Sequence, residues 1–378
     1  MSPANADLNR RLAVDGALLA GPRPPANADG VMAVVNRLGG LQLDPTRTIE
    51  RTELLVLWSR LGTYDRSLVG QLLKERRLFE HAAFYRPIDR LPEFRAQQRA
   101  FREARTSWSG QAGNWIEANK RFHQSILDQL RAEGPLPSRS LDTSLVAEHW
   151  KSTGWTNNRD ITRMLEFMDY RGEVAISGRE GAERLWDLPD RVLPPTDDIS
   201  YDEFLRRRSL HIVRRMGVAN LQEIRARTGE LPDIDRAYLK RRLDEMTESG
   251  QLVAIDDKYW RHADAELDIK PNLTTFLSPF EPLTKDRERT EKMWAFKYKL
   301  EMYVPKEARQ FGHYVLPLLY RERLPGRLSA AMDRKTNVLR VQGLHWEDKP
   351  SADENVAADA ALADLARWLG ADSISRDA

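Results

Sequence analysis

The sequence predicts an α+β protein in which helix-rich modules precede a β-rich C-terminal domain. Residues 197–263 contain three helical patterns followed by a hairpin pattern, and residues 140–194 repeat this plan more loosely. Beyond residue 265, short runs rich in Val, Leu and Tyr lie between turn signals, which is typical of strands. A chain of 378 residues is long enough for several domains. Proline-rich joints mark their boundaries in GPLPSR, RVLPPTDD and KPNL.

The clearest module is predicted at 197–264. A helix in YDEFLRRRSLHIVRRMG ends at Gly217, a short one follows in NLQEIRART, and a longer one in DRAYLKRRLDEMTESG stops at Gly250. QLVAIDDKYW then indicates a hairpin with Asp256 and Asp257 at its turn. Three helices followed by a two-stranded wing define the winged-helix variant of the helix-turn-helix motif.

The remaining domains are predicted on either side of this module. For 135–196 we expect a second winged helix, with helices in LVAEHWKSTG and RDITRMLEFMDYRG and a hairpin in EVAISGREGAERLWDLP. Residues 1–134 are helix-rich and fit a third, embellished winged helix. For 265–378 we expect strands in YKLEMYVP, HYVLPLLY, GRLSAAMD and NVLRVQGLHWE, and a final amphipathic helix in ADENVAADAALADLARWLG.

Composition excludes several classes of site. The chain has no cysteine, which excludes disulfides, thiol nucleophiles, thiolate zinc sites and cysteine-held iron–sulfur clusters. Its seven histidines lack the spacing of a helical metal pair, and neither HExxH nor a phosphate-binding loop occurs. We therefore predict no metal and no cofactor.

Charge and hydropathy indicate a partner and a location. The net charge is only +2, yet basic residues cluster at 206–208 and 240–242. Such clusters form either a nucleic-acid-binding face or simply a solvated helix face. Because no apolar stretch approaches membrane-spanning length, we expect a cytoplasmic protein that makes no membrane contact. The multi-module layout favours a monomer, and a nucleic-acid-binding face would make it nucleoid-associated.

The segment LQLDP places an amide and a carboxylate beside two leucines. In an extended segment, Leu41 and Leu43 would face the core while Gln42 and Asp44 project together from the other side. A structural alternative is that Asp44, followed by Pro45, caps a helix that runs through TRTIERTELLVLWSRLG. The two interpretations are compatible, since a carboxylate is also favoured at a helix N-terminus.

Three stretches of the chain resemble one protein family. They are GGLQLDPTRTIERTELLVLWSRLGTYD with RLFEHA, then GEVAISGREGAERLWDLPDRVLP, and finally LSPFEPLTKDRERTEKMWAFKYKLEMYVPKEARQFGHYVLPLLYRERLPGRLSAAMDRKTNVLRVQG. In this order the chain resembles the bacterial winged-helix DNA glycosylases that remove alkylated bases and unhook interstrand crosslinks, the YcaQ/AlkZ family. The resemblance implies tandem winged helices, a C-terminal β domain and a double-stranded DNA partner with alkylated or crosslinked purines.

The resemblance also implies a catalytic pair. Gln42-Leu43-Asp44 matches the Gln-x-Asp signature of the YcaQ-like branch. An N7-alkylated purine is already a good leaving group, so the enzyme must stabilise positive charge on the sugar and deliver water to C1′. A carboxylate does both, as in glycoside hydrolysis, so Asp44 is assigned this role and Gln42 orients the water. FEHAAFYRP is shorter than its family counterpart, and no role is assigned to His81.

DNA binding is expected through phosphate contacts. Arg47 and Arg51 follow the Gln-x-Asp signature closely and are predicted phosphate ligands, with ion pairs to Glu50 or Glu53 as the structural alternative. A different class of function is a non-enzymatic winged-helix transcriptional regulator, because fold does not imply function. A glycosylase would act on lesions, whereas a regulator would prefer one sequence.

Overall fold

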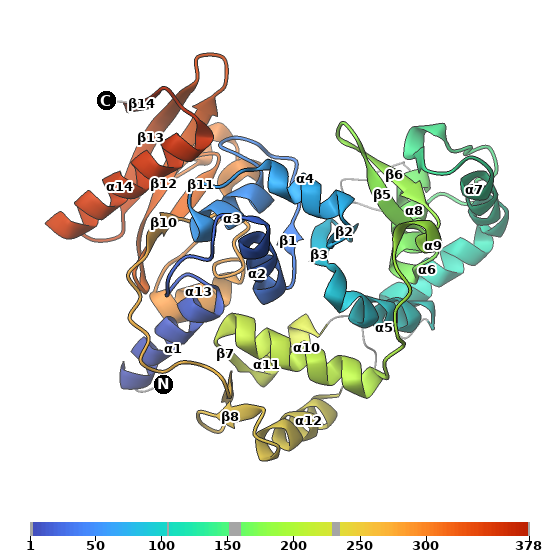
Figure 1. Cartoon of the computed structure of the whole chain (residues 1–378), viewed down its shortest axis with the longest axis horizontal. Coiled ribbons are helices and arrows are strands. Elements are labelled where there is room, and N and C mark those ends of the chain that lie inside the picture. The colour runs from blue at the N-terminus through green and yellow to red at the C-terminus, as the bar shows by residue number, and fades with distance from the viewer. Residues whose placement is uncertain (1–2, 104–105, 151–159, 229–234, 377–378) are drawn as a thin grey trace. The chain divides into compact units, whose positions relative to one another are not determined.

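The computed structural model describes residues 3–103, 106–150, 160–228 and 235–376 (Figure 1). The chain divides into two compact units. Unit 1 comprises residues 1–71, 211–220 and 250–378, and unit 2 comprises residues 72–210 and 221–249. The architecture is α+β, as predicted, with helices and antiparallel sheets in both units.

Unit 1 is built on a five-stranded sheet with the strand order β10-β11-β12-β13-β14. Its strands are Thr274–Phe276, Val315–Tyr320, Arg323–Asp333, Val338–Trp346 and Ser373–Arg376. The first four pair antiparallel, and β14 returns parallel to β13. Helix α14 (Ala352–Leu369) begins with a Ser351–Glu354 capping box and packs against β10 and β11, as its red ribbon in Figure 1 shows.

The N-terminal helices also belong to unit 1, and the first of them shares a core cluster with this sheet. They are α1 (Pro3–Gly16), α2 (Ala28–Leu38), α3 (Thr52–Leu61) and the start of α4 (Ser67–Lys74), with the two-residue strand β1 (Leu41–Gln42) between α2 and α3. One core cluster joins Leu12 of α1 to Leu277, Phe296 and Leu319. A small sheet β7-β9-β8 completes the unit, with strands Val218–Asn220, Tyr259–His262 and Leu252–Ala254.

Gly217 shows how closely two of these segments approach. Its φ of +70° favours glycine, and a Cβ at this position would lie 1.8 Å from the backbone oxygen of Leu12. The glycine that ends α10 (Tyr201–Met216) is therefore required for the packing of α1 as well as for the helix end.

Unit 2 combines a sheet, ordered β3-β2-β5-β6-β4 within the unit, with a helical core. Its strands are Phe84–Pro87, Leu78–His81, Ala175–Glu180, Glu183–Asp187 and Leu136–Pro137; its helices are α5 (Leu91–Arg102), α6 (Ser107–Ala118), α7 (Lys120–Glu133), α8 (Asp160–Arg171), α9 (Pro189–Val192), most of α10, α11 (Leu221–Arg227) and α12 (Arg236–Glu248). Trp108 and Trp115 pack edge-on against Phe167 in this core.

Most predicted elements are confirmed. Helices α10, α11 and α12 are followed by the hairpin β8–β9, and the Asp256 carboxylate accepts the N–H groups of Lys258 and Tyr259 at its turn. Helix α8, the hairpin β5–β6, three C-terminal strands and α14 also lie where predicted. The four domain boundaries, 1–134, 135–196, 197–264 and 265–378, are a different division from the two compact units and remain predictions.

Two predicted elements are wrong. Residues 145–150 of LVAEHWKSTG are not helical, because the Asn119 side chain accepts the N–H groups of Ala147 and Glu148; residues 151–154 lie outside the described ranges. YKLEMYVP contains a 3₁₀ turn (Glu301–Tyr303) in place of a strand. There the Glu301 carboxylate accepts three backbone N–H groups, from residues 310–312.

Candidate active site

Residues 43–51 form an irregular loop that the C-terminal sheet holds in place. The Met332 N–H donates to Thr48 O at 2.9 Å. The Arg334 guanidinium donates to the carbonyl oxygens of Arg47 and Ile49, at 3.0 and 2.6 Å. Strand β12 and the turn after it therefore fix a loop that lies some 285 residues earlier in the chain.

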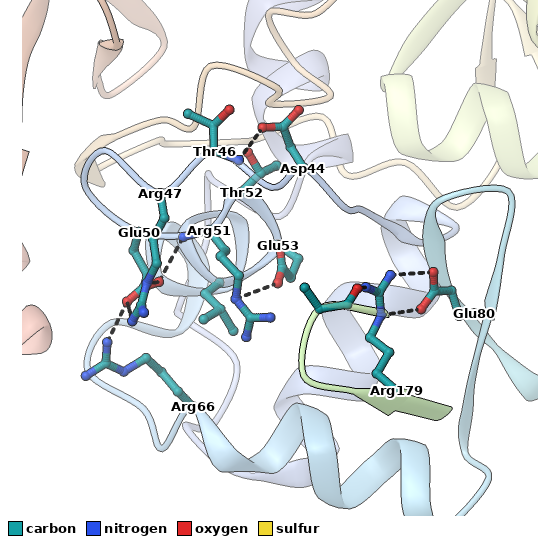
Figure 2. A network of polar contacts seen from close by, with 12 residues as sticks. Asp44, Thr46, Arg47, Glu50, Arg51, Thr52, Glu53, Arg66, Glu80 and Arg179 are labelled. Atoms are coloured by element: carbon teal, nitrogen blue, oxygen red, sulfur yellow. Dashed lines mark hydrogen bonds and ion pairs between the residues drawn. The ribbon is translucent and has the colours of Figure 1, made fainter. Parts of the chain in front are cut away.

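Asp44 lies in this loop and does not cap a helix. Helix α3 begins at Thr52, and Asp44 Oδ1 instead accepts the Thr46 N–H at 2.9 Å (Figure 2). The N-cap prediction is therefore wrong, because the sheet contacts of the loop replace the helical turns that Pro45 was expected to start. Asp44 is half-buried, and only its Oδ1 accepts a hydrogen bond from the residues that the structure describes.

The extended pattern predicted for LQLDP holds for two residues only. Strand β1 contains Leu41, which is buried, and Gln42, which is half-buried. Leu43 is also half-buried, so it does not enter the core as Leu41 does. The structure places Gln42 in β1 and Asp44 two residues later in the loop, each with a half-buried side chain.

A group of buried hydroxyls adjoins the loop. Thr52 Oγ1, at the start of α3, lies 3.4 Å from Tyr314 Oη and 3.4 Å from Ser278 Oγ. Burial raises the pKa of Tyr314 to about 12; Thr52 acts in the opposite direction and the negative charge of Asp44 adds to the rise. Tyr314 is therefore a neutral phenol whose electrostatic environment includes the Asp44 carboxylate.

Gln42 is hydrogen-bonded to a lysine that the sequence analysis did not identify. The Nζ of Lys285 donates to Gln42 Oε1 at 2.7 Å across 243 residues of sequence. Both residues line a pocket of about 520 Å³, whose other walls are Pro279, Phe280, Thr284, Asp286, Arg287, Tyr298 and Leu300. A lysine next to proline-rich sequence has no motif of its own, and no signal within the segment predicts its partner.

The segment that carries Lys285 has a buried anchor. Glu281 and Arg60 are both inaccessible to solvent, and the guanidinium donates to the two carboxylate oxygens at 2.6 and 3.1 Å. Arg60 also donates to Ala17 O at 2.7 Å and to Val56 O at 2.9 Å. Such a pair is tolerated in a core only when its remaining donors are also satisfied, as they largely are here.

The predicted phosphate ligands both have carboxylate partners, as in the structural alternative. Arg47 forms two hydrogen bonds to Glu50, at 2.5 and 2.9 Å, and Arg51 Nε lies 3.2 Å from Glu53 (Figure 2). Their side chains nevertheless remain 52% and 49% exposed. Both guanidinium groups are therefore held in a defined orientation at the surface.

Glu50 organises the charges of the loop. Its carboxylate also accepts Arg66 Nη1 at 2.8 Å and the Arg51 N–H at 3.0 Å. Burial raises the pKa of the Glu50 carboxyl, but the bonds from Arg47 and the Arg51 N–H outweigh it and leave this pKa below its ordinary value. Glu50 is therefore an ionised, buried carboxylate that is hydrogen-bonded to exposed arginines.

The basic clusters noted in the sequence are partly neutralised on their own helices. Arg206 and Arg207 both bind Glu203, and Lys240 and Arg242 bind carboxylates three or four residues away. This arrangement is typical of a solvated helix face. It adds nothing specific to the DNA-binding prediction.

His81 lies in unit 2, in a hairpin with an unusual turn. Its Nδ1 is 2.9 Å from Asp169 Oδ1, and both side chains are buried. Ala82 and Ala83 at the turn have φ of +50° and +58°, a conformation that costs residues with a Cβ some energy. The Ala82 N–H donates to Asp169 Oδ2 at 3.2 Å, which helps to hold the turn.

Two kinds of site are absent from the described ranges. No group of three His, Asp or Glu side chains there is arranged to hold a metal ion. In the same ranges, no helix combines the length and apolar character that crossing a membrane requires.

Comparison with known proteins identifies the class. The family model described as "DNA glycosylase AlkZ-like" matches residues 35–368. The chain therefore belongs to the AlkZ-like DNA glycosylase family. It is an enzyme, a glycosylase that acts on DNA, and the alternative of a non-enzymatic regulator is not supported.

One solved structure shares the fold along the whole chain. The Streptomyces sahachiroi DNA glycosylase AlkZ is similar with a TM-score of 0.64, over 98% of this chain and 98% of that one. The two sequences are 16% identical, so this similarity supports the α+β architecture alone. The substrate has to be inferred from the residues of the site.

Proposed function

We propose that this chain is a monofunctional glycosylase for N7-alkylated purines in double-stranded DNA, including purines joined by an interstrand crosslink. Asp44 is the catalytic carboxylate and Gln42 positions the attacking water. The observation that carries the proposal is the half-buried Asp44 side chain, which accepts one backbone N–H and takes no part in the Arg47–Glu50 and Arg51–Glu53 ion pairs drawn in Figure 2.

The chemistry requires little from the protein besides this pair. N7-alkylation makes the purine cationic, so cleavage of the N-glycosidic bond returns an electron pair to the base and neutralises it. The sugar then carries positive charge, which the Asp44 carboxylate stabilises while it accepts a proton from the water that attacks C1′. No protein nucleophile is involved, so an abasic site remains and the strand is not cut.

The recognition of a crosslinked base is part of the same proposal. A base tethered to both strands cannot rotate freely out of the duplex, as substrates of most base-processing enzymes do. The pocket beside Gln42 has a mixed lining of charged, hydroxyl and apolar side chains. We infer that the pocket beside Gln42 accommodates the lesion or its sugar–phosphate neighbours without full rotation of the base out of the duplex.

The test is base release from duplex DNA that contains N7-methylguanine or a nitrogen-mustard crosslink. Asp44→Asn keeps an oxygen that accepts the Thr46 N–H and removes only the charge, so the loop should persist. We expect a loss of about 10²–10⁴-fold in the single-turnover rate with DNA affinity retained. Wild-type activity in this variant would refute the assignment of Asp44.

A matched control is available in the same unit. Asp65 accepts the Ser67 N–H at 2.8 Å in the same i to i+2 geometry and is exposed. Asp65→Asn should therefore release base at the wild-type rate. Absence of release from either lesion by the wild-type protein would reject the substrate class but not the family.

A further inference from the structure

The hydrogen bond between Lys285 and Gln42 determines which way the amide faces. An ammonium group has donors only, so the atom 2.7 Å from Nζ must be the carbonyl oxygen of Gln42. The amide NH₂ is therefore directed away from Lys285.

Lys285 is presented by a segment fixed on both sides. On its N-terminal side, the N–H groups of Thr284 and Lys285 donate to Glu281 O at 3.1 and 2.8 Å, and Glu281 is bound to Arg60 in the core. On its C-terminal side, Asp286 caps α13 (Arg287–Trp294) by accepting the Arg289 N–H at 3.1 Å. A long lysine side chain loses conformational entropy when it is held, and a fixed backbone reduces the remaining cost.

We propose that Lys285 is a positioning residue for the glycosylase reaction, which acts by fixing the orientation of the Gln42 amide. This inference rests on the proposed function and adds to it a residue that neither the Gln-x-Asp signature nor its neighbours contain. The positive charge of Lys285 opposes the positive charge that develops on the sugar. Its benefit must therefore come through Gln42.

The orientation matters for the path of the proton. With the oxygen held by Lys285, the amide NH₂ donates to the oxygen of the attacking water, and both water hydrogens remain available to the Asp44 carboxylate. In the reverse orientation, the amide oxygen would accept one of these hydrogens and compete with Asp44. As the C1′–O bond forms, the proton passes to Asp44 and the N-glycosidic bond breaks with its electron pair on the base.

A contact with a DNA phosphate is the other role that an exposed lysine beside a DNA-repair site can have. The two roles have different consequences. If Lys285 binds a phosphate, its loss should weaken DNA binding and reduce the salt dependence of that binding, independently of Gln42. If Lys285 positions the Gln42 amide, its loss should lower the rate of base release, and only when Gln42 is present.

The experiment is a double-mutant cycle on the full-length protein, with single-turnover release of N7-methylguanine as the readout. The variants are Lys285→Met, Gln42→Ala and the combination of both. We expect Lys285→Met to slow release on the order of 10-fold, a typical effect of losing one charged hydrogen bond, with duplex affinity unchanged. In the Gln42→Ala background the same change should have no further effect.

Two additional variants make the result specific. Lys285→Arg retains a donor and should recover part of the lost rate. Lys297→Met removes the same charge from a lysine whose Nζ is 3.4 Å from Glu291, beyond the end of α13, and should match wild type. Because Lys285 and Lys297 are both exposed, each variant should melt at the wild-type temperature.

The possible failures are separable. If Gln42→Ala is slow and Lys285→Met matches wild type, the inference about Lys285 is wrong and the proposed function stands. Additive effects, or a loss of affinity with a shallower salt slope, would assign Lys285 to phosphate binding and also overturn it. If Gln42→Ala itself matches wild type, the role proposed for Gln42 falls, and with it this inference.

Discussion

Arg60 of α3 and Glu281 form a fully buried ion pair with two hydrogen bonds, of 2.6 and 3.1 Å, across 221 residues of sequence. The pair joins the helix that follows the Gln42–Asp44 loop to the segment that ends in Lys285. The segments that flank the candidate active site are therefore linked by an interaction in the core.

The first prediction concerns this pair. Glu281→Gln or Arg60→Met leaves one charge buried without its counterpart, and each should lower the free energy of unfolding by about 3–5 kcal/mol. Urea denaturation would measure this as a lower midpoint. As a control, Asp359→Asn breaks the exposed pair with Arg376, at 2.6 Å, and should change stability by less than about 1 kcal/mol. Equal effects in both pairs would contradict the role of burial.

A second prediction concerns pH. The pKa of Glu50 is lowered, so its ion pairs stabilise the folded state fully above the ordinary value of 4.5 and are lost as pH falls below it, through the folded-state pKa. The wild-type protein should therefore lose stability as the pH falls below the ordinary value of 4.5. Glu50→Gln should be less stable at neutral pH and show a smaller acid-dependent change in melting temperature. Parallel pH curves for the two proteins would refute this.

A third prediction concerns strand cleavage. Lys285 brings an amine to the site, where its Nζ donates a hydrogen bond to Gln42. A glycosylase that attacks through an amine forms a Schiff base, which borohydride reduces to a covalent protein–DNA adduct. We expect no adduct and no strand break after base release, because water is the nucleophile. An adduct that disappears in Lys285→Met would show that the enzyme is bifunctional.

A fourth prediction tests Arg47 and Arg51 as phosphate ligands. Replacing either with methionine should weaken binding to undamaged duplex of any sequence and reduce the slope of log affinity against log salt by about 1. Arg367 is a matched control, since it is exposed and lies 3.2 Å from Asp364 in an equivalent pair. If Arg367→Met reduces the slope as much as Arg47→Met does, net charge alone would account for the salt dependence of binding.

Elements with strong local signals were predicted well. The spacing of apolar residues and the glycines at the helix ends are enough to predict α10 and α14. The turn at Asp256 is enough to predict the hairpin β8–β9. Errors occurred where a side chain from elsewhere competes with the local pattern. Asn119 takes the backbone N–H groups of 147–148, and Glu301 takes those of 310–312. A propensity argument cannot include such partners.

The sequence by itself determined the class of the protein, the two residues of the Gln-x-Asp signature, and the helices and hairpins whose patterns are local. Tertiary structure alone decided that Asp44 sits in a loop held by Met332 and Arg334, and that Gln42 meets Lys285. The physical reason is that these contacts join residues more than 240 positions apart. Their geometry depends on how a buried core, including Arg60 and Glu281, brings distant segments together.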